Sequence, residues 1–245
     1  MTFWIVPRDF VLVRGEDARP FLQGQLSQDV AEMPVGVSAW SFLLQPQGKV
    51  DAYLRVTCIG DDAFVLDVDT GWGDDVVARL ERFKLRTKAD VRRVDGFQVI
   101  ATLDEDGVLH EELFDDMEVG GEPGTPEEYE AARIRAGMPR MGREIDESTI
   151  PASLGVVDLA VSFTKGCYTG QELVARIDSR GGKTPTRLVG VRGASAEAGA
   201  TVEVEGRDVG RVTSAAGGVA LALVRREVEL PASSSVGELV PLPMS

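Results

Sequence analysis

Histidine and cysteine are scarce in this chain of 245 residues, which contains one histidine, His110, and two cysteines, Cys58 and Cys167. A nucleophile paired with histidine would have to use His110, which lies in the acidic stretch 104–116 and is expected to be a solvated loop or hairpin residue. The two thiols are widely spaced, so they favour a reducing cytosol over a disulfide scaffold, and we expect a cytoplasmic protein. Neither residue type has the close spacing of metal ligands, so we predict no metal site.

Positive charge and long apolar runs are scarce as well. The chain has 26 basic and 40 acidic residues, which gives a formal net charge of −14. Because such a chain repels a phosphate backbone, we expect no nucleic-acid partner. The first ten residues, MTFWIVPRDF, lack the basic and apolar segments of a signal peptide. No apolar run reaches the roughly 18 residues that suggest a membrane span, so we expect no membrane association.

The first part of the chain alternates short strand-like and helix-like runs. This alternation indicates antiparallel sheet with helices packed on one face, an α+β class. From residue 186 onward, short β-rich runs separated by glycine turns indicate a small β-barrel or sandwich. The expected strands are 10–14, 40–44, 50–57, 63–68, 97–103, 188–191, 201–204, 209–213 and 219–224, and the expected helices are 17–25, 73–85 and 127–136.

A candidate helix start lies in the segment KGCYTGQE, residues 165–172. Thr169 and Glu172 have the spacing of a capping box, in which each side chain bonds the other residue's backbone N–H. Tyr168 before the cap and Leu173 within the first turn fit a hydrophobic staple. We therefore predict a helix that starts just after Thr169 and ends near residue 178.

Cys167 lies just before this predicted helix start. Lys165 is two residues earlier and, in an extended segment, points to the same side. A thiol beside a lysine and a helix N-terminus is a setting that favours the thiolate, and Gly166 and Gly170 permit close backbone approach. Cys167 and Lys165 are therefore the candidate catalytic pair. The alternative is a buried, inert cysteine ahead of an ordinary capped helix.

Basic residues gather around this segment. Residues 133–187 carry nine basic and six acidic side chains, a net charge of +3, whereas the rest of the chain carries −17. A local basic region in an acidic protein favours a pocket for an anionic small molecule. The alternative is a solvated face with basic residues spread over it.

The string KGCYTGQE resembles the signature of the YgfZ-type folate-binding proteins, which are relatives of the glycine-cleavage T-protein and have a mitochondrial iron–sulfur assembly factor as their counterpart. Residues 15–29, 43–56 and 133–146 resemble further blocks of that family, and the C-terminal strands resemble its β-barrel module. The resemblance implies a T-protein-like fold of three lobes around a central tetrahydrofolate site. Its expected parts are a folate-binding region, 1–184, with lobes at about 1–95 and 96–184, and a barrel, 185–245.

The resemblance also implies site residues. Tyr129 stands where bacterial relatives have a tryptophan linked to folate, and its ring could stack on a pterin. Arg133 is a candidate for bidentate pairing with the folate carboxylates. Arg8 replaces a second tryptophan of this kind, and Phe10, on the same strand face, could substitute for it. For Tyr129 and Arg133 the alternative is one exposed helix face. The remaining motif residues of the signature are Gly166, Tyr168, Thr169, Gly170, Gln171 and Glu172.

One departure from the family bears on activity. The aminomethyltransferase relatives carry paired aspartates, at positions that Ala52 and Tyr53 occupy here. A transferase of this kind needs a carboxylate near the folate nitrogen as acid or base, and Asp51 in a regular strand would point to the opposite face.

The leading hypothesis is therefore a tetrahydrofolate-binding monomer that supports maturation or repair of iron–sulfur proteins, with iron–sulfur client or assembly proteins as partners. The alternatives are a folate-dependent aminomethyl or one-carbon transferase, and an interaction protein that has lost the ligand.

Overall fold

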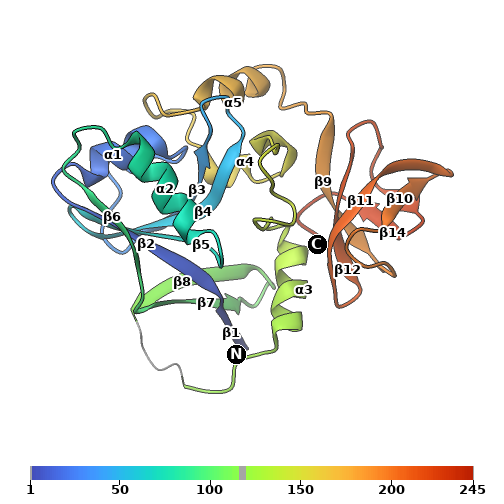
Figure 1. The fold of residues 1–245 in the computed structure, drawn as a ribbon. Coiled ribbons are helices and arrows are strands. Elements are labelled where there is room, and N and C mark those ends of the chain that lie inside the picture. The colour runs from blue at the N-terminus through green and yellow to red at the C-terminus, as the bar shows by residue number, and fades with distance from the viewer. Residues whose placement is uncertain (1, 116–119, 245) are drawn as a thin grey trace.

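The computed structural model describes residues 2–115 and 120–244 and confirms the α+β class (Figure 1). Every strand pairing is antiparallel, and the strands form three sheets. The largest part of the N-terminal half is a five-stranded sheet in the order β3-β4-β5-β2-β6. Its strands are β2 (Arg8–Arg14), β3 (Ser38–Leu44), β4 (Val50–Gly60), β5 (Ala63–Asp69) and β6 (Asp90–Val94).

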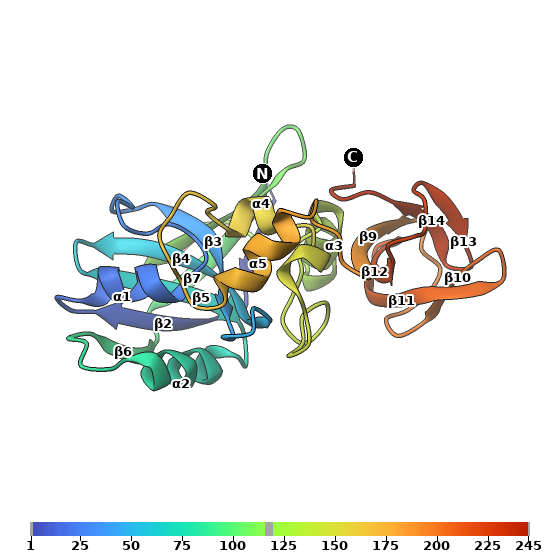
Figure 2. The same ribbon diagram turned by 90° about the horizontal axis from the view of Figure 1, so that it is seen from above.

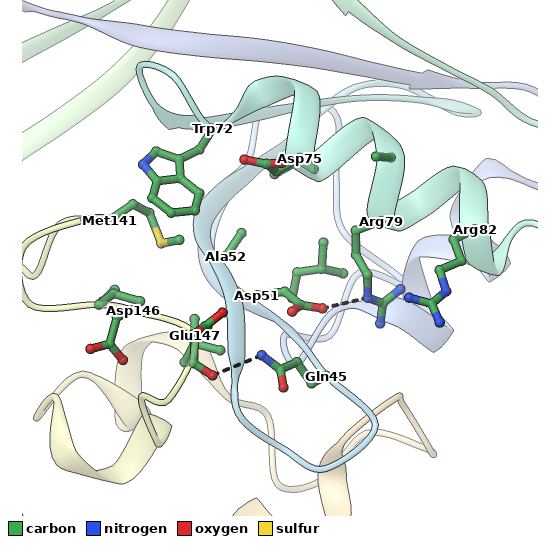
Figure 3. Close-up of a pocket in the computed structure, with 16 residues that line it drawn as sticks. Gln45, Asp51, Ala52, Trp72, Asp75, Arg79, Arg82, Met141, Asp146 and Glu147 are labelled. Atoms are coloured by element: carbon green, nitrogen blue, oxygen red, sulfur yellow. Dashed lines mark hydrogen bonds and ion pairs between the residues drawn. The ribbon is translucent and has the colours of Figure 1, made fainter.

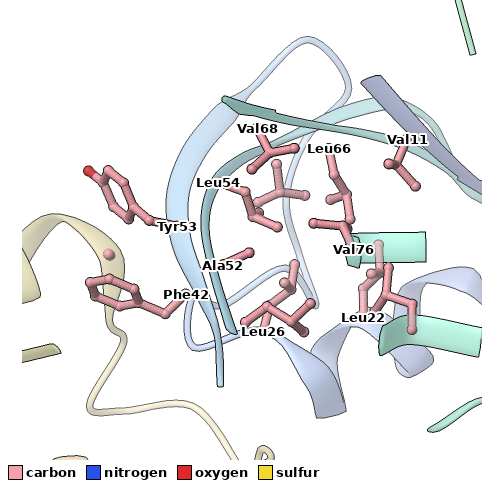
Figure 4. Packing of buried hydrophobic residues seen from close by; sticks show 14 of the residues in the cluster. Val11, Leu22, Leu26, Phe42, Ala52, Tyr53, Leu54, Leu66, Val68 and Val76 are labelled. Atoms are coloured by element: carbon pink, nitrogen blue, oxygen red, sulfur yellow. The ribbon is translucent and has the colours of Figure 1, made fainter. Parts of the chain in front are cut away.

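Two helices, α1 (Ala18–Gln25) and α2 (Gly73–Phe83), cover one face of this sheet (Figure 2). Their apolar side chains, such as Leu22 and Val76, pack on alternate residues of the central strands, such as Leu54 (Figure 4). The i, i+4 spacing of the buried Val76 and Leu80 is part of the helical pattern from which α2 was predicted, whereas β4 and β5 are buried along nearly their whole length. This packing fixes the orientation of β4 and α2, which matters for the site below.

A small sheet in the order β1-β7-β8 lies beside the large one. Its strands are β1 (Phe3–Val6), β7 (Phe97–Leu103) and β8 (Leu109–Asp115). The sequence predicted β7, whereas β1 and β8 were not predicted. Because β1 pairs with β7, the small sheet combines residues from both predicted lobes. His110 lies on β8 of the β7–β8 hairpin, with an exposed ring bonded to Asp104, as expected for a solvated hairpin residue.

Helix α3 (Pro126–Ala136) lies between the small sheet and the C-terminal barrel (Figure 1). Its first turn carries a full capping box: Thr125 accepts from the N–H of Glu128, and Glu128 accepts from the N–H of Thr125. Tyr129 faces the small sheet, whereas Ile134 packs against the barrel. With both of its sides buried, α3 joins the two halves of the molecule.

The C-terminal strands form a nearly closed six-stranded barrel in the order β10-β11-β12-β9-β14-β13 (Figure 2). The Ser235 N–H donates to the Glu203 carbonyl at 2.9 Å and joins the two ends of the sheet. All four predicted barrel strands are present. The strands are β9 (Thr186–Arg192), β10 (Thr201–Val204), β11 (Arg207–Ala216), β12 (Val219–Arg225), β13 (Ala232–Ser234) and β14 (Gly237–Val240).

Between α3 and the barrel the chain passes back over the large sheet. This segment contains a 3₁₀ turn, η1 (Pro151–Ser153), and two helices, α4 (Val157–Ala160) and α5 (Gln171–Asp178). None of the helices in the described part of the chain has the length and apolar character needed to cross a membrane.

Candidate functional site

The signature loop is anchored by Lys165. Its ammonium group donates to the carbonyls of Gln23, Leu26 and Gln28 at 2.7–2.8 Å. These carbonyls lie at the C-terminal end of α1, where a helix leaves backbone acceptors without partners. Burial lowers the pKa of Lys165 to about 8, and Asp29 opposes this effect. An ammonium has three N–H donors, so in this conformation all of them hold the loop, and a catalytic role for Lys165 remains a prediction.

Cys167 is exposed at the surface of this loop, whereas Cys58 is buried. The alternative of a buried cysteine ahead of the helix is therefore wrong. Helix α5 begins at Gln171 with Gly170 as its N-cap, so the thiol lies three residues before the cap. The field of a helix N-terminus acts within about its first turn, and the loop geometry, not the helix, is what presents Cys167 to solvent.

The predicted capping box at Thr169 and Glu172 is wrong. No side chain caps α5, and Thr169 instead turns toward α1, where its N–H donates to the Gly24 carbonyl at 3.0 Å. The reason lies in Gly170, which has a φ of +83°. A Cβ atom there would lie 2.5 Å from the Gln45 carbonyl oxygen. Tight packing against the β3–β4 hairpin thus requires glycine at the cap position.

The predicted ligand residues Arg8 and Tyr129 meet in the interior. Glu111 accepts from the Tyr129 hydroxyl at 2.6 Å and from Arg8 at 3.0 Å, and Arg8 also donates to Asp69 at 3.1 Å. Burial raises the pKa of Glu111, but Arg8, Tyr129 and Arg55 together outweigh it, so the net pKa is lowered. Burial and the neighbouring Glu111 raise the pKa of Tyr129 well above its ordinary value.

The same network continues to Arg133. Arg140 donates to Asp69 at 3.2 Å and to Glu130 at 3.3 Å, and Glu130 accepts from Arg133 at 2.7 Å. Arg133 also donates to Glu144 at 3.3 Å. We call this chain of contacts the central network; its members are Arg8, Asp69, Glu111, Tyr129, Glu130, Arg133, Arg140 and Glu144.

The structure thus brings Arg8, Tyr129 and Arg133 into one network, but as partners of buried carboxylates. Tyr129 is 6% exposed and Arg133 is 2% exposed, so the alternative of an exposed helix face is wrong. Phe10 is buried against Phe97, with ring centroids 5.9 Å apart. Among the cavities formed by the described residues, none of those found is lined by Arg8, Phe10, Tyr129 or Arg133. The polar groups of Arg8, Tyr129 and Arg133 are directed at Asp69, Glu111 and Glu144.

A cavity of about 670 Å³ lies elsewhere, between the start of β4, helix α2 and the segment 141–147 (Figure 3). We call it the α2 cavity. Its size lies within the range of small-molecule sites, about 300–1,000 Å³. The ring of Trp72 and the side chains of Ala52 and Met141 supply apolar lining. Its charged lining is formed by Asp51, Asp75, Arg79, Arg82, Asp146 and Glu147.

Asp51 reaches this cavity through a β-bulge. Leu43 pairs with Ala52 but Leu44 pairs with Val50, which leaves Asp51 as an extra residue. Asp51 and Ala52 therefore both line the α2 cavity, and the prediction that Asp51 points to the opposite face is wrong because a bulge breaks the period-two alternation. Asp51 accepts from Arg79 at 2.8 Å.

The α2 cavity was not predicted from the sequence. The feature of the sequence that could have revealed this cavity is the pair Arg79 and Arg82, which are spaced i, i+3 on the predicted helix, with Trp72 just before it. Across residues 2–115 and 120–244, no group of three or more histidine, cysteine, aspartate or glutamate side chains is arranged to hold a metal ion.

Comparison with known proteins gives consistent matches. Residues 185–239 match the family described as CAF17, C-terminal beta-barrel domain. The iron-sulfur cluster assembly factor IBA57, mitochondrial, of Mus musculus is 28% identical over 90% of this chain and 76% of its own length. The tRNA-modifying protein YgfZ of Serratia proteamaculans is 27% identical over 70% of this chain, which spans 64% of that relative.

The fold has a similar counterpart among solved structures. The glycine cleavage system aminomethyltransferase T of Bartonella henselae matches 100% of this chain and 86% of its own chain, with a TM-score of 0.76 and 19% sequence identity. The T-protein-like fold expected from the signature is therefore confirmed. The chain is thus similar to the YgfZ and IBA57 proteins along most of its sequence, and its whole fold is that of the T-protein.

Proposed function

We propose that this protein binds tetrahydrofolate and supports the maturation of iron–sulfur proteins, with Cys167 as its working thiol. The observation that carries the proposal is an exposed thiol on a loop that Lys165 fastens to α1, in a relative of IBA57. Such a thiol is accessible to a partner protein without any opening of the fold.

The names of the relatives point to two roles, iron–sulfur cluster assembly and tRNA modification. The net charge of this chain favours a role in iron–sulfur cluster assembly. A net charge of −14 repels RNA, whereas a protein partner needs only local complementarity.

The α2 cavity is the place that best fits the folate. Trp72 offers a ring face for a pterin, and Asp51 offers a carboxylate for its amino and ring N–H groups. Arg82 lies exposed at the rim, where it suits the carboxylates of the glutamate tail. Bound tetrahydrofolate would supply one-carbon chemistry; the protein residues named here orient it and exclude water from the pterin.

Titration with 5-formyltetrahydrofolate should quench tryptophan fluorescence, because Trp72 lines the proposed site whereas the other two tryptophans, Trp4 and Trp40, do not. Trp72→Phe should remove most of the quenching, and Arg82→Gln should weaken binding about tenfold, the loss of one charge-assisted contact. Calorimetry gives the affinity independently of the fluorescence.

Two further variants locate the ligand. Arg92→Gln removes an exposed guanidinium that does not line the cavity and should bind as the wild type does. Tyr129→Phe should also leave the affinity unchanged. If Tyr129→Phe weakened binding while Arg82→Gln did not, the folate would lie in the central network instead, and no binding at high micromolar ligand would refute the folate proposal.

Cys167→Ala should abolish the support of iron–sulfur enzymes while leaving folate binding intact, because the thiol lies outside the α2 cavity. The measurement is the activity of iron–sulfur enzymes, under oxidative stress, in cells that depend on this protein. Cys58→Ala, which changes the buried thiol, is the matched control. Full activity with Cys167→Ala would rule out the thiol as the working group.

One observation favours the alternative of a one-carbon transferase: the bulge places Asp51 in the α2 cavity beside Ala52. A single carboxylate is thereby available where the transferases have a pair. Release of 5,10-methylenetetrahydrofolate from an aminomethyl donor by the wild type, and its loss in Asp51→Asn, would establish this activity. If the wild type released none, the transferase alternative would be refuted and the maturation role would stand.

A further inference from the structure

A second large cavity lies between β8, the start of β3 and the end of β4. It is a groove of about 920 Å³, which we call the β8 groove. Its lining combines apolar side chains, among them Val35, Ile59 and Phe114, with the acidic Glu111, Glu112 and Asp115. It shares no lining residue with the α2 cavity and does not include Cys167.

The groove runs along an open sheet edge. β8 is the last strand of its sheet, paired only with β7 in the described part of the chain. The Glu111 carbonyl already accepts from the guanidinium of Arg55, which comes from the large sheet. This contact shows that the backbone of β8 presents acceptors on the side away from β7. An open edge of this kind is a template for an added strand.

The apolar part of the groove is exposed. Val35 is 58% exposed and Ile59 is 39% exposed, and Val37 beside them is 42% exposed. Hydrogen bonds from Gly36 and Cys58 hold the two segments side by side. Contiguous exposed apolar side chains on a soluble protein are often binding sites.

Charge decides which partner suits this surface. The groove carries the exposed side chains of Glu112 and Asp115, whereas the carboxylate of Glu111 is buried against Arg8, and the chain carries a net charge of −14. A second copy of this chain would bring like charge to the groove, and a nucleic acid would do the same. A segment with lysine or arginine is attracted, and its apolar side chains can cover Val35 and Ile59.

We propose that the β8 groove binds an extended segment of a partner protein, with alternating apolar and basic residues, which adds to β8 as a strand. Main-chain hydrogen bonds to the edge then supply affinity, and the alternate side chains supply specificity. The proposal goes beyond the function proposed above, because it requires neither Cys167 nor the folate.

The test uses the full chain and the fluorescein-labelled peptide KVKVKVKV, followed by fluorescence anisotropy. Binding should be saturable, and Ile59→Asn or Glu112→Lys should weaken it at least tenfold. Val35→Asn, at a more exposed position, serves if Ile59→Asn does not fold. A peptide N-methylated at alternate residues keeps its charge and side chains but loses one edge of hydrogen bonds, so it should bind at least tenfold more weakly.

Leu159→Asn is the matched control, because Leu159 is 54% exposed and lies on α4 outside the groove. It should bind the peptide as the wild type does, and so should Cys167→Ala. Equal binding of the N-methylated peptide, or of Ile59→Asn and Val35→Asn, would mean unspecific attraction of a polycation to an acidic protein and would overturn the proposal. Absence of saturable binding would overturn it as well.

Discussion

Arg8→Met should lower the free energy of unfolding by about 3–5 kcal/mol, the usual cost of removing one partner from a buried ion pair. Arg8 contacts Asp69 and Glu111, and all three side chains are at most 7% exposed. Without the guanidinium, two buried carboxylates lose a positive partner and have no water to replace it. For a chain of this size the melting temperature should fall by roughly 6–20 °C.

Urea denaturation at pH 7.5 measures this loss. Arg92→Met is the control, because its ion pair with Asp90 is exposed and should change stability by no more than about 0.5 kcal/mol. The double variant Arg8→Met/Glu111→Gln should recover part of the loss, since it removes one of the uncompensated charges. If Arg8→Met lowered the free energy of unfolding by less than about 1 kcal/mol, water would have to reach the carboxylates of Asp69 and Glu111 in the variant.

The cost of Arg8→Met should also depend on pH. In the wild type the pKa of Glu111 in the folded protein lies below its ordinary value of 4.5, because Arg8, Tyr129 and Arg55 outweigh burial. Its contribution to stability is therefore present above about pH 4.5 and is lost as the pH falls through the folded pKa. In Arg8→Met, burial dominates and raises that pKa, so the folded protein takes up a proton in mild acid. The difference from the wild type should shrink between pH 7.5 and pH 4.5.

Arg133→Met should cost a similar amount, about 3–5 kcal/mol, with the effect centred on the junction between α3 and the barrel. Arg133 pairs with Glu144 and Glu130. Glu144 in turn accepts from the Ser214 hydroxyl on β11 at 2.6 Å. Loss of the guanidinium leaves the Glu144 carboxylate buried with neutral donors only, so the contact between the central network and the barrel weakens.

Hydrogen exchange separates this prediction from the previous one. In Arg133→Met, amide protection should fall in α3 and around Ser214, whereas in Arg8→Met it should fall in the small sheet and β2. Arg133→Met/Glu144→Gln should regain stability, because the amide keeps an acceptor for Ser214 without a buried charge. Unchanged protection around Ser214 in the single variant would contradict the role assigned to Glu144.

Local patterns predicted most of the regular elements correctly. Strand β7 and the barrel strand β10 were predicted with the bounds that the structure shows, and α2 ends two residues earlier than expected. These elements have a clear hydrophobic period. The strands β1, β6 and β8 were missed because their sequences are short or rich in charged residues, and they are held by pairing with β7 or β2.

The sequence by itself determined the family signature, the α+β class and the barrel, whereas the exposure of Cys167 was settled only by the structure. The first three features depend on residue identity and on short-range periodicity. Tertiary structure alone decided where the polar groups point. Lys165 is committed to the end of α1, and the expected capping box fails because Gly170 packs against the hairpin.

The location of the candidate ligand site was also decided by the tertiary structure. The sequence predicted that Arg8, Tyr129 and Arg133 bind a ligand. In the structure their polar groups instead bond carboxylates from β5, β8 and the loop after α3. Asp51 was assigned to the wrong face because a single bulged residue, set by the pairing of β3 with β4, reverses the alternation. Contacts between segments far apart in the chain carry no local period, so only the folded structure could reveal the central network and the α2 cavity.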